Sequence, residues 1–249
     1  MISMFRRGCL IVCLSITSLL LFTLYSSADI RLATGEYIPY TSQEIVGGGR
    51  STELVQRVFK EMNEPMLIDF LPWKRVRAEV ENGTYVAAFP YMKTHERRRE
   101  FLFSDPILVW ESDIYASRDT TIQYQDFSDL SGYTQCLPLG NAGHPTLDEM
   151  YRQGKIQRVS PVSCWKMLLR GRADFMVEDR EVAKAQLLRT LGDDRDQIKT
   201  LAHGVRFDFG YVIFSKQHPR AKELLEKFNK ALRQLIEIGE IEGLKLVDH

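Results

Sequence analysis

The feature of this sequence that constrains its fold most is a regular alternation of short apolar runs with amphipathic segments, which continues almost to the end of the chain. Residues 30–34 (IRLAT) and 66–70 (MLIDF) are predicted strands, and residues 51–62 between them carry apolar side chains on one face at helical spacing. A second helical segment leads to a third predicted strand at 85–89 (YVAAF). Strands that alternate with helices in this way predict a parallel sheet with helices on its faces.

The second half of the chain repeats this plan. Three further predicted strands are each followed by a helical segment, at residues 133–137, 156–160 and 173–177. Two longer strand-like stretches, 107–117 and 205–215, lie before and after this half, and a last helix is predicted at 219–238. If that helix returns to the first half, the chain crosses between the halves twice.

The expected fold class is therefore α/β, with two Rossmann-like lobes joined by two crossing hinge strands. The first lobe is expected to be discontinuous, with residues 29–115 and 208–249, and residues 116–207 are expected to form a second lobe inserted into it. Paired crossing strands behave as a hinge, which is what a cleft that closes on a ligand requires.

The first 28 residues differ in character from the rest of the chain. Arg6 and Arg7 precede an apolar run from Cys9 to Tyr25, and small residues follow at the end of the segment. This pattern predicts a secretory signal peptide, residues 1–28, cleaved after Ala28, and therefore an exported protein. The alternative is a retained membrane anchor, because the run is long for a signal core and slightly short for a typical span.

The expected export determines what the sequence predicts for the cysteines. The chain has four, of which Cys9 and Cys13 lie in the predicted signal peptide, so the mature protein keeps Cys136 and Cys164. A pair of cysteines in an exported chain predicts a disulfide, and two buried free thiols are the alternative. The sequence has no C-x-x-C and no clustered His/Cys spacing, so we expect no metal site and no cofactor.

The charge is balanced overall but uneven locally. Lys+Arg and Asp+Glu each number 33, so no net charge draws the protein to nucleic acid or anionic lipid, and we expect no nucleic-acid partner. Residues 93–107 (KTHERRREFLFSDPI) nevertheless join three consecutive arginines to Phe-Leu-Phe. We expect a short helix to begin at this run, with Phe101 and Phe103 holding it to the core and a turn at residues 104–106. Arg98 and Arg99 are assigned to a solvated face.

Ligands of open parallel sheets bind outside the carboxyl ends of the strands. After the strand at 85–89 come Tyr91, Thr94 and Arg97, and after the strand at 173–177 come Glu178 and Asp179. A cation of one lobe is thus expected to face acids of the other lobe across a cleft.

Three aromatic residues, Tyr37, Tyr40 and Trp73, also follow predicted strands on the cleft side. Aromatic rings in such places commonly sandwich the apolar part of a ligand. Packing between loop and helix is the alternative for each of them.

Two stretches resemble a known family. GTYVAAFPYMKTHERRREFLFSDPI is similar to the first-lobe signature of periplasmic solute-binding proteins of family 3, the polar amino acid receptors of ABC importers, and RGRADFMVEDREVA is similar to their second-lobe signature. The resemblance implies a type II periplasmic binding fold. It also implies that Arg97 holds the α-carboxylate of a ligand and that Asp179 binds its α-amino group.

The chain departs from the family pattern at the first-lobe signature. Amino-acid-binding members usually have Ser or Thr before the T-x-x-R element, where this chain has Phe89, Pro90, Tyr91 and Met92. It also has GGGRSTEL where they tend to have G-F-x-x-D. These departures put an ordinary α-amino acid in question as the ligand.

The expected function is that of a monomeric periplasmic binding protein without enzymatic activity. It would capture a small polar, carboxylate-bearing ligand, such as an amino acid or derivative, for the permease of an ABC importer. One alternative is a sensor that presents its ligand to a membrane receptor. Another is a dehydratase-like enzyme on the same fold, with Glu178 or Asp179 as the general acid.

Overall fold

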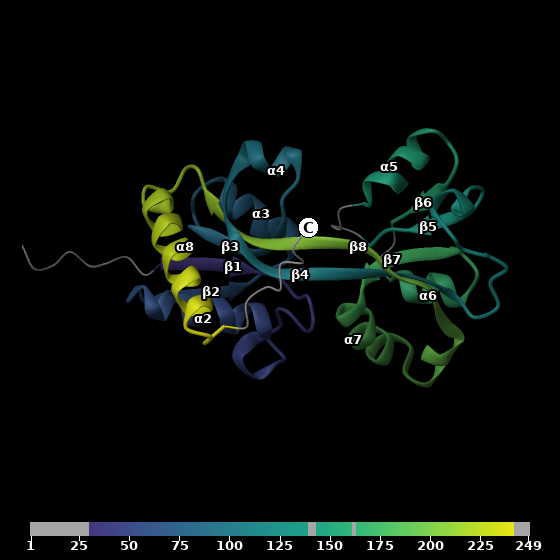
Figure 1. The fold of residues 1–249 in the computed structure, drawn as a ribbon, viewed down its shortest axis with the longest axis horizontal. Coiled ribbons are helices and arrows are strands. Elements are labelled where there is room, and N and C mark those ends of the chain that lie inside the picture. Colours follow the sequence, from purple (N-terminus) through teal and green to yellow (C-terminus); the bar gives the residue numbers. More distant parts are fainter. Residues whose placement is uncertain (1–29, 139–142, 161–162, 242–249) are drawn as a thin grey trace, which may run out of the picture.

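The computed structural model describes residues 30–138, 143–160 and 163–241, and the predicted signal peptide lies outside them. A single sheet of eight strands runs through the molecule in the order β2-β1-β3-β8-β4-β7-β5-β6. Helices pack on both ends of this sheet, so that two lobes lie side by side with β4 and β8 running between them (Figure 1). This arrangement confirms the predicted two-lobed α/β fold class.

The first lobe is built on parallel strands. β1 (Ile30–Thr34) pairs in parallel with both β2 (Met66–Phe70) and β3 (Ala87–Met92). Its other elements are η1 (Val46–Gly48), α2 (Arg50–Glu61), α3 (Trp73–Glu81), α4 (His95–Glu100) and α8 (Ala221–Glu237). The C-terminal helix α8 packs on α2 in this lobe, where Phe59 and Phe228 have ring centroids 5.9 Å apart (Figure 1).

The second lobe is smaller. β5 (Thr134–Cys136) pairs in parallel with β6 (Gln157–Val159) and with β7 (Phe175–Asp179). Its helices are η2 (Phe127–Leu130), α5 (Pro145–Arg152), α6 (Cys164–Leu169), α7 (Arg180–Leu191) and η3 (Gly192–Gln197). A buried cluster that includes Trp165, Leu168 and Met176 forms part of its core.

The two crossing strands are longer than the sequence predicted. β4 (Phe101–Ser117) and β8 (Ile198–Ser215) pair antiparallel from one lobe to the other. Gly210 is needed where they cross, because a Cβ at this position would lie 2.7 Å from Cγ of Leu108. The predicted lobe boundaries at 115/116 and 207/208 fall inside these strands.

The turn predicted at residues 104–106 is wrong, because these residues lie inside β4. The pairing with β8 is irregular on either side of Pro106, which has no N–H to donate to the ladder. The hydroxyl of Ser104 accepts a 2.9 Å hydrogen bond from the Val212 N–H, and the Asp105 N–H donates to Asn229 Oδ1 at 2.8 Å. These contacts with β8 and α8 hold an extended backbone where local preference favours a turn.

The predicted disulfide between Cys136 and Cys164 is confirmed. It joins the end of β5 to the start of α6, with the two Cα atoms 5.6 Å apart. Both residues are buried in the core of the second lobe. The bond therefore fixes a three-residue strand that has few ladder partners of its own.

Candidate ligand-binding site

A cavity of about 840 Å³ lies between the two lobes. Its wall comes from the start of α3, the end of β3 and α4 in the first lobe, from the crossing strands, and from the ends of β5 and β7 in the second lobe. Six of the residues predicted to bind a ligand line it, namely Tyr37, Trp73, Tyr91, Arg97, Glu178 and Asp179. The carboxyl ends of β3 and β7 thus meet at one cavity, as the rule for open sheets requires.

Arg97 is the cation of the first-lobe wall. It lies in α4, whose N-cap is Thr94, and the Thr94 hydroxyl accepts the Arg97 N–H at 3.2 Å. The guanidinium lies 5.1 Å from the centroid of the Tyr91 ring and donates to the Met92 carbonyl at 3.2 Å. Burial lowers the pKa of Arg97, which means that its charge is poorly solvated. No carboxylate of the described residues forms an ion pair with it.

The other cations of the wall differ from Arg97. Arg77 is held by Glu96 at 2.6 Å and by Glu100 at 2.7 Å. Arg206 pairs with Asp208 and donates to the Gly143 carbonyl at 2.9 Å. Lys74 also lines the cavity, but its side chain is exposed.

Asp179 ends β7 and is the N-cap of α7. Its Oδ1 accepts the N–H groups of Glu181 and Val182, each at 3.0 Å. The Tyr40 hydroxyl donates to the same oxygen at 3.0 Å, and the Glu111 N–H donates to Oδ2 at 3.2 Å. Burial raises the pKa of Asp179, and these hydrogen bonds oppose the rise.

Two of the predicted residues, Thr94 and Tyr40, are not part of the cavity wall. Thr94 caps the helix that carries Arg97, and Tyr40 lies behind Tyr37, with their rings stacked at 5.7 Å. Contact of either residue with a ligand stays a prediction. In the structure, both hold a residue that does line the cavity.

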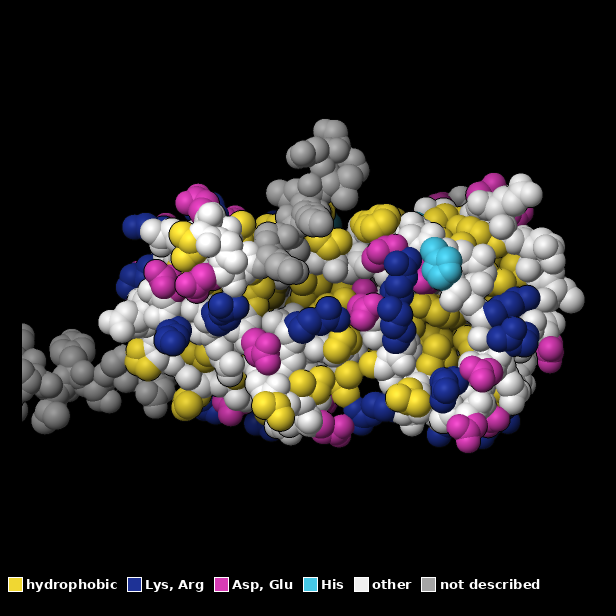
Figure 2. Space-filling view, turned by 60° about the horizontal axis from the view of Figure 1, so that its bottom comes forward, with side chains coloured by type: hydrophobic (Ala, Val, Ile, Leu, Met, Phe, Trp, Pro, Cys, Tyr) yellow, Lys and Arg dark blue, Asp and Glu magenta, His cyan; other side chains and the backbone are white. Residues whose placement is uncertain are grey.

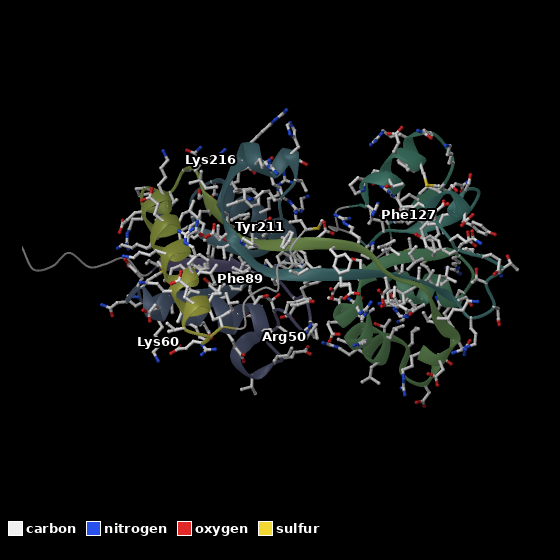
Figure 3. The ribbon with its side chains drawn as sticks, in the orientation of Figure 1. Arg50, Lys60, Phe89, Phe127, Tyr211 and Lys216 are labelled. Carbon is white, nitrogen blue, oxygen red and sulfur yellow. A yellow bond between two sulfur atoms is a disulfide. The ribbon has the colours of Figure 1, made fainter. Side chains whose placement is uncertain are left out.

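Three other polar contacts between described residues of the two lobes accompany the contact of Tyr40 with Asp179. The Tyr37 hydroxyl donates to Glu178 Oε1 at 3.4 Å, Arg50 lies 3.7 Å from Glu181, and Arg189 lies 3.0 Å from Glu44. Arg50 points from the start of α2 toward α7 (Figure 3). On this face of the molecule, basic and acidic side chains lie close together near the middle (Figure 2). We call these four contacts the interlobe seam.

Aromatic rings form much of the remaining wall. Trp73 meets Tyr91 edge-on at 5.6 Å, and Tyr37 meets Trp110 edge-on at 6.1 Å. The Trp73 ring also needs Gly35, because a Cβ there would lie 2.5 Å from Cε2 of the indole. The cavity can therefore enclose a flat apolar group beside its charged groups.

Several lining residues were missed by the sequence analysis. Trp110 and Ser112 of β4 lie directly opposite Asp208 and Arg206 of β8, and all four reach the cavity. Both strands were predicted, but alternate residues of a strand face opposite sides, so the register must be known before a face is assigned. His144 was also missed as a wall residue; burial, with a smaller contribution from Arg206, lowers its pKa to about 4, so it is neutral at neutral pH.

Two α/β lobes that share a sheet and enclose a cavity define a two-lobed protein of the periplasmic-binding type. The sequence places it further: residues 30–246 match the bacterial extracellular solute-binding proteins, family 3, and the chain belongs to that family. This confirms the predicted family. A comparison with curated protein sequences gave no match.

Solved structures with the same fold include a histidine kinase sensor domain similar to periplasmic binding proteins, with 19% identity and a TM-score of 0.73, covering 86% of this chain and 93% of that one. An ancestral arginine-binding protein bound to arginine has 19% identity and a TM-score of 0.71, covering 86% and 95%. A putative L-cystine ABC transporter protein from Listeria monocytogenes has 17% identity and a TM-score of 0.66, covering 85% and 91%. At these identities the likeness establishes the fold alone.

Proposed function

We propose that this protein is a periplasmic binding protein that captures a small carboxylate-bearing metabolite between its lobes and delivers it to an ABC importer. The observation that carries the proposal is Arg97, a half-buried arginine at the cavity wall whose pKa is lowered by burial and which no described carboxylate neutralises. A buried guanidinium without an acid is costly, and a carboxylate ligand would offset that cost through a bidentate pair.

The surroundings of Arg97 support this proposal. Tyr91 places its ring against the guanidinium, and Trp73 packs on Tyr91, so the anion site is continuous with an apolar wall.

Membership of the solute-binding family supports export of the protein and its work with an ABC importer. None of the helices in the part of the chain that the structure describes is long and apolar enough to span a bilayer.

A sensing role is the second candidate. The similarity to a histidine kinase sensor domain favours it, because that domain has the same two-lobed fold. In both roles the protein captures a ligand between its lobes. The roles differ in the membrane protein that recognises the ligand-bound form. Pull-down of the protein with the permease of a co-expressed importer, compared with a membrane kinase, would separate them.

The most direct test of the proposal is to identify what the protein carries. The mature protein, purified from its native periplasm, is examined by native mass spectrometry and then denatured to release the compound. We expect one small carboxylate-bearing compound per chain, and titration of the ligand-free, refolded protein with it should restore the complex. Release of a compound without an acidic group would contradict the proposal.

We also expect no catalysis. Incubation with prephenate or arogenate should give no product above the buffer rate, because Asp179 already accepts four donors of the protein and is not placed as a general acid. Product formation followed by absorbance is the measurement. Turnover that disappears on replacing Glu178 or Asp179 would overturn the binding-protein proposal.

A further inference from the structure

The acids at the cavity wall are engaged by the protein itself. Asp179 accepts four donors: three of them share Oδ1, and the Glu111 N–H occupies one of the lone-pair positions of Oδ2. One of those donors, the Tyr40 hydroxyl, comes from the first lobe and is neutral. Asp179 lines the cavity but is only 3% exposed, so little of its surface is open to a ligand.

The two other acids of the wall are also in contact with protein donors. Asp208 pairs with its neighbour Arg206, and Nη2 of that arginine donates to Oδ1 at 2.9 Å. Oε1 of Glu178 accepts the Asp179 N–H at 3.0 Å and the Tyr37 hydroxyl at 3.4 Å. An incoming ammonium group would compete with a guanidinium at one acid and with a tyrosine of the seam at each of the others.

Two buried groups of the wall that can donate a hydrogen bond have no partner among the described residues. Trp110 Nε1 and the Tyr91 hydroxyl are buried and make no hydrogen bond within the described residues, and each residue is 6% exposed. Buried polar groups are nearly always satisfied, and an indole N–H can only donate. Burial raises the pKa of Tyr91 to about 12, so its phenol keeps its proton at neutral pH. The indole N–H and Arg97 can only donate, and the phenol can donate as well as accept, so these groups favour acceptors on a ligand.

From these contacts we infer that the ligand is an organic carboxylate with a flat, mainly apolar body and no ammonium group, such as an aromatic or cyclic acid. This inference rests on the proposed function, because it takes Arg97 as the anion site. The flat body would lie against Tyr37, Trp73, Tyr91 and Trp110. Such a cavity, with aromatic walls and a few placed polar groups, is typical of sites that enclose more than a small polar ion.

Matched probes that differ only in the α-ammonium group test the inference. Ligand-free mature protein is titrated calorimetrically with 3-phenylpropanoate and L-phenylalanine, with 3-(indol-3-yl)propanoate and L-tryptophan, and with 4-methylpentanoate and L-leucine. We expect each aromatic acid to bind at least about tenfold more tightly than its amino acid, because the ammonium loses water and meets acids that donors of the protein already engage. The aliphatic acid should bind more weakly than the aromatic acids. An amino acid that binds as tightly as its partner, or a panel in which no acid binds, overturns the inference.

Two variants separate this inference from the proposed function. In Asp179→Asn the ratio of the two affinities should stay the same, even if the lost helix cap lowers stability; a selective loss of the amino acid would overturn the inference. In Arg97→Ala both members of a pair should lose affinity. If amino acids bind as tightly as their partners and lose affinity in Arg97→Ala, the proposed anion site stands and the inferred ligand class is rejected. If the acids bind equally well with and without Arg97, the proposed anion site itself is rejected.

Discussion

Replacing Arg97 by alanine is expected to weaken binding of the carried carboxylate by at least about 2 kcal/mol, or about 30-fold in Kd, which is the scale of a desolvated charge pair. The physical reason is that the guanidinium is half-buried and without an acid, so its charge is available to the ligand. Arg97→Lys keeps the charge but loses the planar fork, and should recover only part of the affinity. Calorimetric titration of the ligand-free variants with the carried compound measures both losses.

The neighbouring Arg99 provides the matched control. It lies in the same helix but is exposed, and its Nη2 lies 2.8 Å from Nε2 of His95 on the solvent side. Arg99→Ala should change Kd by less than about twofold, since exposed charges contribute little. Arg97→Ala loses one hydrogen bond to Met92 and the contact with the Tyr91 ring but breaks no ion pair of the described residues, so it should unfold at a denaturant concentration close to that of the wild type. Equal losses at both arginines would mean that the anion binds elsewhere in the cavity.

Much of the fold could be predicted from the sequence because its signals are local. β1 and β2 have the bounds that their apolar runs indicated, and a helix, α7, follows β7 as the pattern predicted. In each case the pattern of apolar residues reports the face that the element buries, and that pattern survives in the packed molecule. The order of the elements then fixed the class of fold.

The crossing strands were only partly predicted because their ends depend on partners far away in the sequence. Residues 198–204 of β8 include Lys199, Thr200 and His203, which carry no strand pattern, but the first part of this segment pairs with the end of β4. β3 continues through Pro90, which usually ends a strand. The ladder formed with distant residues outweighs weak local preference at these places.

The residues of the candidate site were likewise predicted from the sequence only in part. Arg97, Glu178 and Asp179 could be found because they lie at or just after the ends of strands, and the carboxyl ends of parallel strands meet. Trp110 and Arg206 could not, because only the register of β4 against β8 turns them toward the cavity. The engagement of Asp179 by Tyr40 was also beyond sequence reasoning, since the two residues lie 139 positions apart.

Loss of the disulfide is expected to lower the free energy of unfolding by about 3 to 4 kcal/mol, on the chain-entropy estimate for the loop that it closes. The double variant Cys136→Ala, Cys164→Ala should therefore unfold at a lower urea concentration, measured by tryptophan fluorescence, with the wild type as reference.

Loss of the disulfide should affect the cavity as well, because Gln135 and Leu137, on either side of Cys136, line it. β5 has only three residues and shares one register pair with β7, so without its covalent tie to α6 this wall would be held mainly by β6. A ligand that binds the folded form stabilises it by mass action, so saturating ligand should restore part of the lost stability. Equal stability of the variant and the wild type would mean that the packing of Cys136 and Cys164 in the core, and not the bond, holds this part of the lobe together.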